Sequence, residues 1–182
     1  MSQRTVAVIV GSLRKDSVSR KVAKAIAALA PASLTFRFVE IGDLAFYNED
    51  VEPNPPQPWT GFRAHIKAAD AVLFVTPEYN RSVPAVLKNA VDVGSRPYGA
   101  SAWSGKPAAV VSVSPGAIGG FGANHHLRQS LVFLNMPALP HEAYVGNAFS
   151  LFDDKGELTN EKTAEFLKAF GQTFADWIEQ QL

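Results

Sequence analysis

The sequence contains no cysteine. This excludes a disulfide framework, a thiolate nucleophile and a cysteine-ligated metal site, so any redox chemistry has to use a bound cofactor. Long hydrophobic runs are also missing, because no apolar stretch approaches the ~20 residues that a membrane-spanning helix needs. The first residues lack the apolar region and small-residue cleavage site of a secretory signal. We therefore expect a cytoplasmic protein with no membrane anchor.

An excess of charge of either sign is absent as well. The 182 residues include 17 basic and 17 acidic side chains, which give a formal net charge of zero at pH 7. Such a chain has no overall field to attract nucleic acid or an anionic membrane surface, so we expect neither as a partner. The length and the hydrophobic content of 47% are those of an ordinary globular protein. A single domain over residues 1–182 is therefore predicted.

Apolar runs and helix-like spacings alternate along the chain. Strands are predicted over residues 5–10, 34–41, 71–76, 107–114 and, more weakly, within 138–145. Helices are predicted over residues 18–29, 62–69, 84–93, 125–134 and 160–182. The proline-rich stretch 53–58 predicts a surface connection that is neither helix nor central strand.

This alternation predicts an α/β fold with a doubly wound, five-stranded parallel sheet and helices on both faces, because crossovers between parallel strands cover the sheet. In such sheets ligands bind beyond the carboxyl ends of the strands, at the point where the winding changes direction. The loops after the first, third and fourth strands are residues 11–19, 77–83 and 115–122. We expect these three loops to share one crevice.

The first loop, "GSLRKDSVS", runs from a buried strand into a helix. Backbone N–H groups at a helix N-terminus, serine hydroxyls and the positive end of the helix dipole all suit an anion. Arg14 adds a forked donor for a phosphate, and Gly11 lets the chain turn off the strand. The spacing lacks both G-x-x-x-x-G-K-[ST] and G-x-G-x-x-G, which favours a single phosphate monoester. The alternative interpretation is that Ser17 and Ser19 only cap the helix and that Arg14 is a solvated surface charge.

The second loop decides between these interpretations. The stretch "TPEYN" places Thr76, Pro77, Glu78, Tyr79 and Asn80 directly at the end of a buried strand. Polar backbone and side-chain groups at that place suit the edge of a flat heteroaromatic ring. The sequence therefore predicts a ligand that carries both a phosphate and such a ring.

The motifs "VGSLRKDS", "TPEYNRSVPAVLKNAVD" and "SPGAIGG" resemble the NADPH-dependent FMN reductase family, a flavodoxin-like group that includes chromate and quinone reductases. The resemblance covers nearly the whole chain. It implies one flavodoxin-like FMN-binding domain with strand order 2-1-3-4-5, with FMN as cofactor and NADPH or NADH as reductant. It also implies ping-pong hydride transfer to a small-molecule acceptor, which is a quinone, an azo or nitro compound, or a chromate-like oxyanion. The family further implies a homodimer or homotetramer.

The resemblance also assigns site residues. The FMN phosphate is surrounded by Ser12, Arg14, Ser17, Val18 and Ser19. The isoalloxazine ring is held by Pro77, Glu78, Tyr79 and Asn80 on one side and by Ser114, Pro115 and Gly116 on the other. No catalytic protein side chain is expected, because the flavin carries the chemistry.

Two other classes of function remain open at this point. A one-electron flavodoxin-type carrier would bind the same cofactor, although such carriers are strongly acidic and this chain is neutral. A non-catalytic phosphate- or nucleotide-binding protein would share the first loop but gives no reason for "PEYN". The pair His125 and His126 lacks neighbouring acidic residues in a metal-ligand pattern, so we expect surface or interface residues and no metal site.

Overall fold

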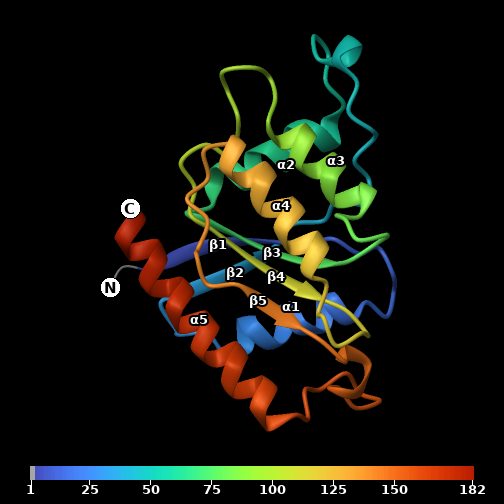
Figure 1. Cartoon of the computed structure of the whole chain (residues 1–182). Coiled ribbons are helices and arrows are strands. Elements are labelled where there is room, and N and C mark those ends of the chain that lie inside the picture. The colour runs from blue at the N-terminus through green and yellow to red at the C-terminus, as the bar shows by residue number, and fades with distance from the viewer. Residues whose placement is uncertain (1–2) are drawn as a thin grey trace.

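Five parallel strands form the centre of the computed structural model, which describes residues 3–182 (Figure 1). The strands are β1 (Arg4–Val10), β2 (Leu34–Phe38), β3 (Ala71–Pro77), β4 (Ala108–Val113) and β5 (Ala143–Val145). Their order across the sheet is β2-β1-β3-β4-β5, and every neighbouring pair is parallel. The predicted fold class and strand order are therefore confirmed.

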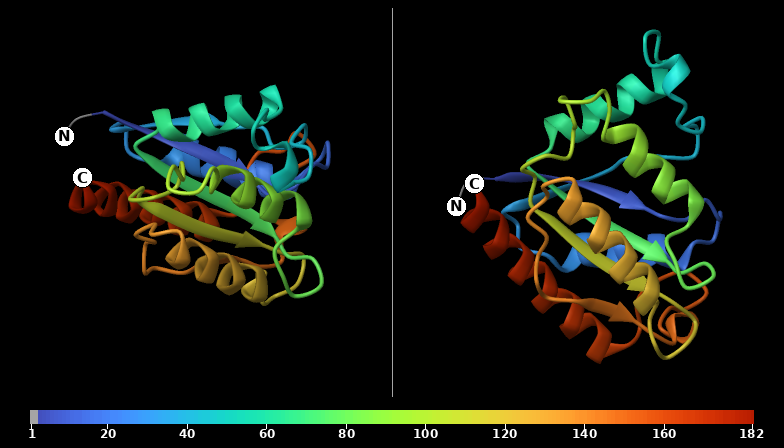
Figure 2. Two further views of the ribbon diagram at one scale, coloured as in Figure 1. Left: turned by 90° about the horizontal axis from the view of Figure 1, so that it is seen from above. Right: turned by 45° about the horizontal axis from the view of Figure 1, so that its top comes forward.

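Helices cover both faces of the sheet, as Figure 2 shows. They are α1 (Val18–Leu29), α2 (Gln57–Ala68), α3 (Ala85–Gly94), α4 (Phe121–Phe133) and α5 (Glu161–Gln181), with single 3₁₀ turns η1 (Glu49–Val51) and η2 (Ala148–Ser150). Helices α1 and α5 pack on one face, and α2, α3 and α4 pack on the other. None of the helices within residues 3–182 combines the length and the apolar character that crossing a membrane requires.

The central strands are apolar on both faces because each face is covered by helices. In β1, Val8 and Val10 point into the core shared with α1 and α5, whereas Ala7 and Ile9 point into the core shared with α2, α3 and α4. The second core also contains a fully buried tryptophan, Trp103, whose indole N–H donates to the Val91 carbonyl oxygen at 2.9 Å. A continuous apolar run in the sequence therefore corresponds to burial on two sides.

Two helices begin earlier than their local patterns predict. Helix α2 starts at Gln57 and includes Pro58, so the expectation that residues 53–58 contain no helix is wrong for these two residues. Proline is tolerated there because the N–H groups of the first turn have no helical partner to lose. Helix α4 starts at Phe121 and not at residue 125, so the expected loop ends at Gly120, which caps the helix with a φ of 80°.

Candidate functional site

A cleft of about 230 Å³ lies at the carboxyl ends of the central strands. Three loops, which follow β1, β3 and β4, and the turn η2 after β5 contribute its walls. The lining residues are Ser12, Arg14, Ser17, Val18, Ser19, Pro77, Glu78, Tyr79, Val113, Ser114, Pro115, Ala148 and Phe149. The crevice expected from the doubly wound topology is therefore present.

Most of the predicted site residues meet in this cleft. Among the twelve, only Asn80 and Gly116 do not line it. Asn80 has a positive φ of 52° in the turn that follows Tyr79, and Gly116 donates its N–H to the Ser114 hydroxyl at 3.1 Å. The roles in FMN binding assigned to all twelve residues stay predictions.

The sequence reasoning missed the wall that follows the fifth strand. Ala148 and the exposed Phe149 belong to η2, which comes shortly after β5 (Ala143–Val145). The predicted topology could have revealed this wall, because the carboxyl end of a parallel fifth strand lies at the same end of the sheet as those of the other strands. Val113, the last residue of β4, was also missed although it directly precedes the predicted Ser114.

The first loop presents hydrogen-bond donors to the cleft. Ser17 is the N-cap of α1, and its hydroxyl oxygen accepts the Arg20 N–H at 3.2 Å. Within the described chain, the backbone N–H groups of Ser17, Val18 and Ser19 have no protein acceptor, as expected for a first helical turn. The interpretation of Ser17 as a helix cap is thus correct, and it is compatible with anion binding at the remaining N–H groups.

Arg14 is an unpaired cation at this cleft. Its side chain is exposed, and among residues 3–182 the guanidinium has no hydrogen-bond or ion-pair partner. The hydroxyl of buried Ser12 accepts the Arg14 backbone N–H at 3.4 Å, which ties the start of the loop together. An unpaired guanidinium beside serine hydroxyls and free N–H groups is a donor set suited to a phosphate.

Gly11 places this loop close to β3. Its N–H donates to the Val75 carbonyl oxygen at 2.9 Å, which extends the pairing of β1 with β3 by one residue. A Cβ at this position would lie 2.9 Å from the Thr76 Oγ1 atom and 3.0 Å from a methyl group of Leu87. Glycine is needed here for this close approach, whereas the sequence indicated only the turn off the strand.

The second loop is clamped to the N-terminus of α4. The Glu78 carboxylate, whose side chain is only 12% exposed, accepts the N–H groups of Gly122 at 2.7 Å and Ala123 at 3.2 Å. Negative charge is favourable at a helix N-terminus, because the first N–H groups lack helical acceptors. This carboxylate explains why α4 begins before residue 125. The two loops that follow β3 and β4 are thereby joined at one side of the cleft.

A tight turn completes this second loop. Tyr79 and Ser82 exchange two backbone hydrogen bonds, at 3.1 and 3.0 Å, and the residues between them, Asn80 and Arg81, both have positive φ. Asparagine adopts this conformation more easily than most residues. The Ser82 hydroxyl also contacts His126 Nδ1 at 2.9 Å, which fixes the turn to α4 a second time. Tyr79 is left half exposed at the cleft.

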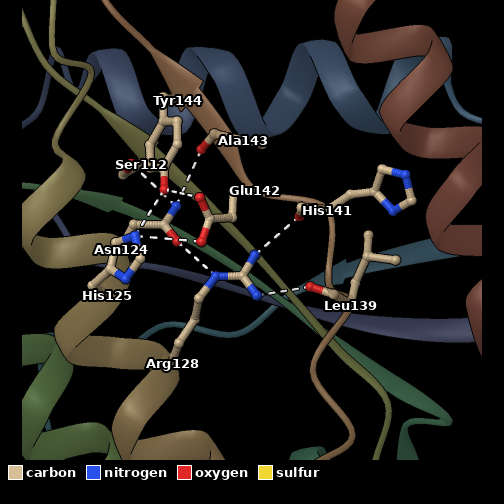
Figure 3. Close-up of polar contacts among 9 residues, drawn as sticks. All are labelled: Ser112, Asn124, His125, Arg128, Leu139, His141, Glu142, Ala143 and Tyr144. Carbon is tan, nitrogen blue, oxygen red and sulfur yellow. Dashed lines mark hydrogen bonds and ion pairs between the residues drawn. The ribbon is translucent and has the colours of Figure 1, made fainter.

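A network of polar side chains fastens α4 to β4 and β5 (Figure 3). The fully buried Asn124 donates to the Ser112 hydroxyl and to the Ala143 carbonyl oxygen, both at 3.2 Å. Its own oxygen accepts the Arg128 Nε–H at 2.8 Å, and the other Arg128 nitrogens donate to the carbonyl oxygens of Leu139 and His141. Because Asn124 lies in the first turn of α4, the network fixes the start of this helix against β4 and β5.

The rim of the same network carries three titratable side chains. The Tyr144 hydroxyl donates to the Glu142 carboxylate, and His125 Nε2 lies 3.0 Å from the Tyr144 hydroxyl and 3.3 Å from Glu142 Oε1. Burial, followed by the hydrogen bond to Glu142, raises the pKa of Tyr144 to about 12. His125 and His126 are both exposed, as predicted. Residues 3–182 contain no group of three or more His, Cys, Asp or Glu side chains arranged to hold a metal ion.

Comparison with known proteins places the chain. Residues 4–150 match the family described as NADPH-dependent FMN reductase. The chain belongs to this family. As an NADPH-dependent FMN reductase, the protein is an oxidoreductase that uses FMN and a reduced nicotinamide.

Similar proteins include quinone reductases and an NAD(P)H oxidoreductase of known structure. A quinone reductase of Pseudomonas putida is 67% identical over 177 residues, which are 96% of this chain and 95% of that protein. A 2-hydroxy-1,4-benzoquinone reductase of Burkholderia sp. is 42% identical over 97% of both chains. The solved structure of FerB, a flavoenzyme NAD(P)H:(acceptor) oxidoreductase from Paracoccus denitrificans, superposes with a TM-score of 0.91 at 44% identity and covers 98% of both chains.

The cleft of this FMN reductase fits its cofactor chemically. An unpaired guanidinium and acceptor-free N–H groups stand at the α1 end, where a phosphate would bind. At the other end, Pro77, Tyr79 and Pro115 offer flat apolar surfaces, and the Ser114 hydroxyl offers a polar group. The cleft thus has one end suited to an anion and one end suited to a flat ring.

Proposed function

We propose that the protein is an NAD(P)H:quinone oxidoreductase that binds FMN in this cleft and works by a ping-pong cycle. The observation that supports this most directly is that loops from three strands, far apart in sequence, bring ten of the twelve predicted residues into one cleft. The names of the Pseudomonas putida and Burkholderia relatives supply the quinone as acceptor class. The net reaction is that NAD(P)H, a proton and a quinone give NAD(P)⁺ and a hydroquinone.

The α1 end of the cleft would hold the phosphate. Arg14 can reach it as a forked cation, while the N–H groups of Val18 and Ser19 and the hydroxyls of Ser12 and Ser17 can donate to it. The N–H groups of Val18 and Ser19 belong to a helix start that is fixed by its own cap, so little of their conformational freedom remains to be lost on binding. This end of the site contributes affinity and does not take part in electron transfer.

The other end would hold the ring and leave it accessible. Pro77, Tyr79, Ser114 and Pro115 line this end, and the clamp made by the Glu78 carboxylate fixes the spacing between their two loops. When bound, FMN supplies the chemistry, because it takes a hydride from the nicotinamide and passes two electrons to the acceptor. The volume of about 230 Å³ is below the ~300 to 1,000 Å³ of pockets that enclose a whole ligand. A cofactor held in such a cleft therefore keeps surface exposed to its reaction partners.

A ping-pong cycle follows if nicotinamide and acceptor use this exposed surface one after the other. In steady-state assays with varied NADPH and varied benzoquinone, we expect parallel lines in double-reciprocal plots. In rapid mixing without quinone, NADPH should bleach the yellow holoenzyme with one equivalent of NADP⁺ formed, and quinone should then restore the colour. Intersecting lines, or NADPH oxidation only when quinone is present, would exclude the ping-pong order.

The same experiment separates the other functions. If neither NADPH nor NADH bleaches the holoenzyme, the protein is an electron carrier. If the protein binds no FMN, the cleft holds a different phosphate ligand.

We propose that azo compounds, nitroaromatics and chromate-like oxyanions also serve as acceptors, which is tested by replacing quinone in the reoxidation step. We further propose a cytoplasmic homodimer or homotetramer, and light scattering on the holoenzyme measures this oligomeric state.

A further inference from the structure

A second hollow, of about 500 Å³, lies between α1 and the segment after β5. We call it the basic groove, and it is lined by the cations Lys15, Arg20, Lys21, Lys24 and Lys155. Its carboxylates are Asp16 and Glu157. The chain as a whole has zero net charge, so this groove is a local concentration of positive charge. A cleft lined by one sign of charge raises the local concentration of the opposite ion.

Most of these cations are not neutralised by the protein. Arg20 is held by Glu40 through hydrogen bonds of 2.8 and 2.7 Å. In contrast, the ammonium groups of the four lysines make no hydrogen bond or ion pair with any side chain in the part of the chain that the structure describes. Four ammonium groups without a partner around one hollow make it suitable for binding an external anion.

Helix α1 bears these charges at an energetic cost. The helix contains Arg20, Lys21 and Lys24 and no acidic residue, so like charges face one another at spacings of three and four. Arg20 and Lys21 lie in its first turn, where the helix dipole disfavours cations and favours anions. An anion bound in the groove would offset both effects.

The opposite wall of the groove is an ordered hairpin. Phe152 pairs with Leu158, and the Asp153 N–H donates to the Glu157 carbonyl oxygen at 3.0 Å. At its tip, Gly156 has a φ of 82°, and a Cβ there would lie 3.3 Å from Lys21 Cε. The Lys21 side chain therefore reaches across the groove to this hairpin. Phe152 and Leu158, with alanines of α1, also give the groove an apolar floor.

The groove adjoins the α1 end of the cofactor cleft. Ser17 lines both hollows, and the hairpin wall follows directly after η2, whose Phe149 lines the cleft. An extended ligand that runs from the ring end of the cleft past Ser17 would therefore enter the groove. The volume of the groove lies in the ~300 to 1,000 Å³ range of small-molecule sites. The groove suits a group that is partly apolar and aromatic and carries a phosphate.

We propose that the basic groove binds the adenosine end of the nicotinamide cofactor, with Lys21, Lys24 and Lys155 around the 2′-phosphate. This inference rests on the proposed function, in which the nicotinamide end lies at the cleft. NADPH differs from NADH by this one phosphate, and phosphate monoesters carry about −1.5 to −2 charges at pH 7. The unpaired lysines therefore make the groove selective for NADPH over NADH.

The direct test uses isothermal titration calorimetry of the FMN-loaded protein with adenosine 2′,5′-bisphosphate and with adenosine 5′-phosphate. The wild-type protein should bind the bisphosphate about tenfold more tightly, because charge-assisted hydrogen bonds add ~1.5 to 3 kcal/mol where they are well formed. The double variant Lys21→Gln with Lys24→Gln should lose this preference. Lys168→Gln is the matched control, because Lys168 is exposed on α5, outside the groove, and the change removes the same charge.

Kinetics give an independent readout. The ratio of kcat/KM for NADPH to kcat/KM for NADH should fall about tenfold in the double variant and stay at the wild-type value in Lys168→Gln. Equal bisphosphate affinity in wild type and double variant would overturn the proposal, and so would wild-type protein that binds both adenosine phosphates equally. If inorganic phosphate competes as well as the bisphosphate does, the groove is a general anion site and the adenosine assignment is wrong.

Failure of the proposed function would look different. If the holoenzyme reduces no quinone but still binds the bisphosphate through Lys21 and Lys24, the acceptor assignment fails and the groove assignment stands. If quinone reduction is rapid but the double variant binds the bisphosphate normally, the groove assignment alone fails. Melting temperatures of both variants within the wild-type range confirm that the substitutions leave the fold intact.

Discussion

The Glu78 carboxylate accepts the backbone N–H of Gly122 at 2.7 Å, across 44 residues of sequence. This contact joins the loop after β3 to the start of α4. Both loops line the ring end of the cleft, so the contact sets the distance between the two walls of the predicted flavin site. The same carboxylate satisfies two helix N–H groups that would otherwise lack an acceptor.

Removing this carboxylate should affect both stability and cofactor affinity. We expect Glu78→Ala to lower the free energy of unfolding by about 1 to 2 kcal/mol, as for the loss of a helix cap. FMN should bind more weakly, because the two loops are no longer held together. Urea denaturation of apoprotein and FMN fluorescence titration measure these effects. Arg81→Gln is the control, since exposed Arg81 touches the same carboxylate at 3.4 Å and its loss should change stability by less than about 0.5 kcal/mol.

Two glycine-to-alanine substitutions should have opposite effects. A Cβ on Gly122 would collide with the carbonyl group of Arg81, so Gly122→Ala has to push the turn at Tyr79–Ser82 away from α4. We expect a loss of about 1 to 3 kcal/mol, typical of overpacking. In the middle of α2, a Cβ on Gly61 meets only the Gln57 side chain at 3.6 Å, so Gly61→Ala should stabilise by roughly 0.5 to 1 kcal/mol. Urea denaturation of both variants measures their free energies of unfolding. A Gly61→Ala variant less stable than wild type would contradict the argument that a Cβ at this position has room.

Arg14→Ala should weaken FMN binding roughly 10- to 100-fold, which corresponds to the loss of charge-assisted hydrogen bonds of ~1.5 to 3 kcal/mol. The apoprotein should melt at the wild-type temperature, because the guanidinium has no partner in the chain within residues 3–182. The matched control is Arg37→Ala, which removes an exposed arginine from β2, away from the cleft. An unchanged FMN titration for Arg14→Ala would remove this residue from the site.

The Tyr144 hydroxyl should lose its proton at a higher pH than an ordinary tyrosine does. Burial and the hydrogen bond to Glu142 raise its pKa from 10.0 to about 12, so the protonated form is favoured in the folded protein. Its contribution to stability is therefore complete below pH 10 and is lost as the pH rises from about 10 through 12. Ultraviolet titration of tyrosinate should show a component near pH 12 that is absent in Tyr144→Phe.

A second tyrosine provides the control for this titration. Burial also raises the pKa of Tyr47, so its delayed component should persist in the Tyr144→Phe variant. The free energy of unfolding of wild type and variant should converge between about pH 10 and pH 12. A variant that keeps the component near pH 12 would show that another tyrosine produces it.

The sequence by itself determined the sheet and the end of the sheet at which the cleft lies. Continuous apolar runs identified β1, β3 and β4 because strands buried on both faces need no alternation. Right-handed crossovers between parallel strands then placed the loops after these strands at the same end of the sheet. Local pattern and resemblance to the family therefore pointed to motif residues, such as Ser17 and Pro77, that line the cleft.

Tertiary structure alone decided where α4 begins, which walls close the cleft and which charges gather in the basic groove. The start of α4 at Phe121 depends on the Glu78 carboxylate, which no window around residue 121 contains. Phe149 and Lys155 come from the segment after β5. They approach α1 only because the carboxyl ends of the parallel strands β1 and β5 lie at the same end of the sheet. Local periodicity records whether a residue is buried, but it carries no information about which distant backbone N–H or charge that residue will meet. These contacts are set by packing across the sheet.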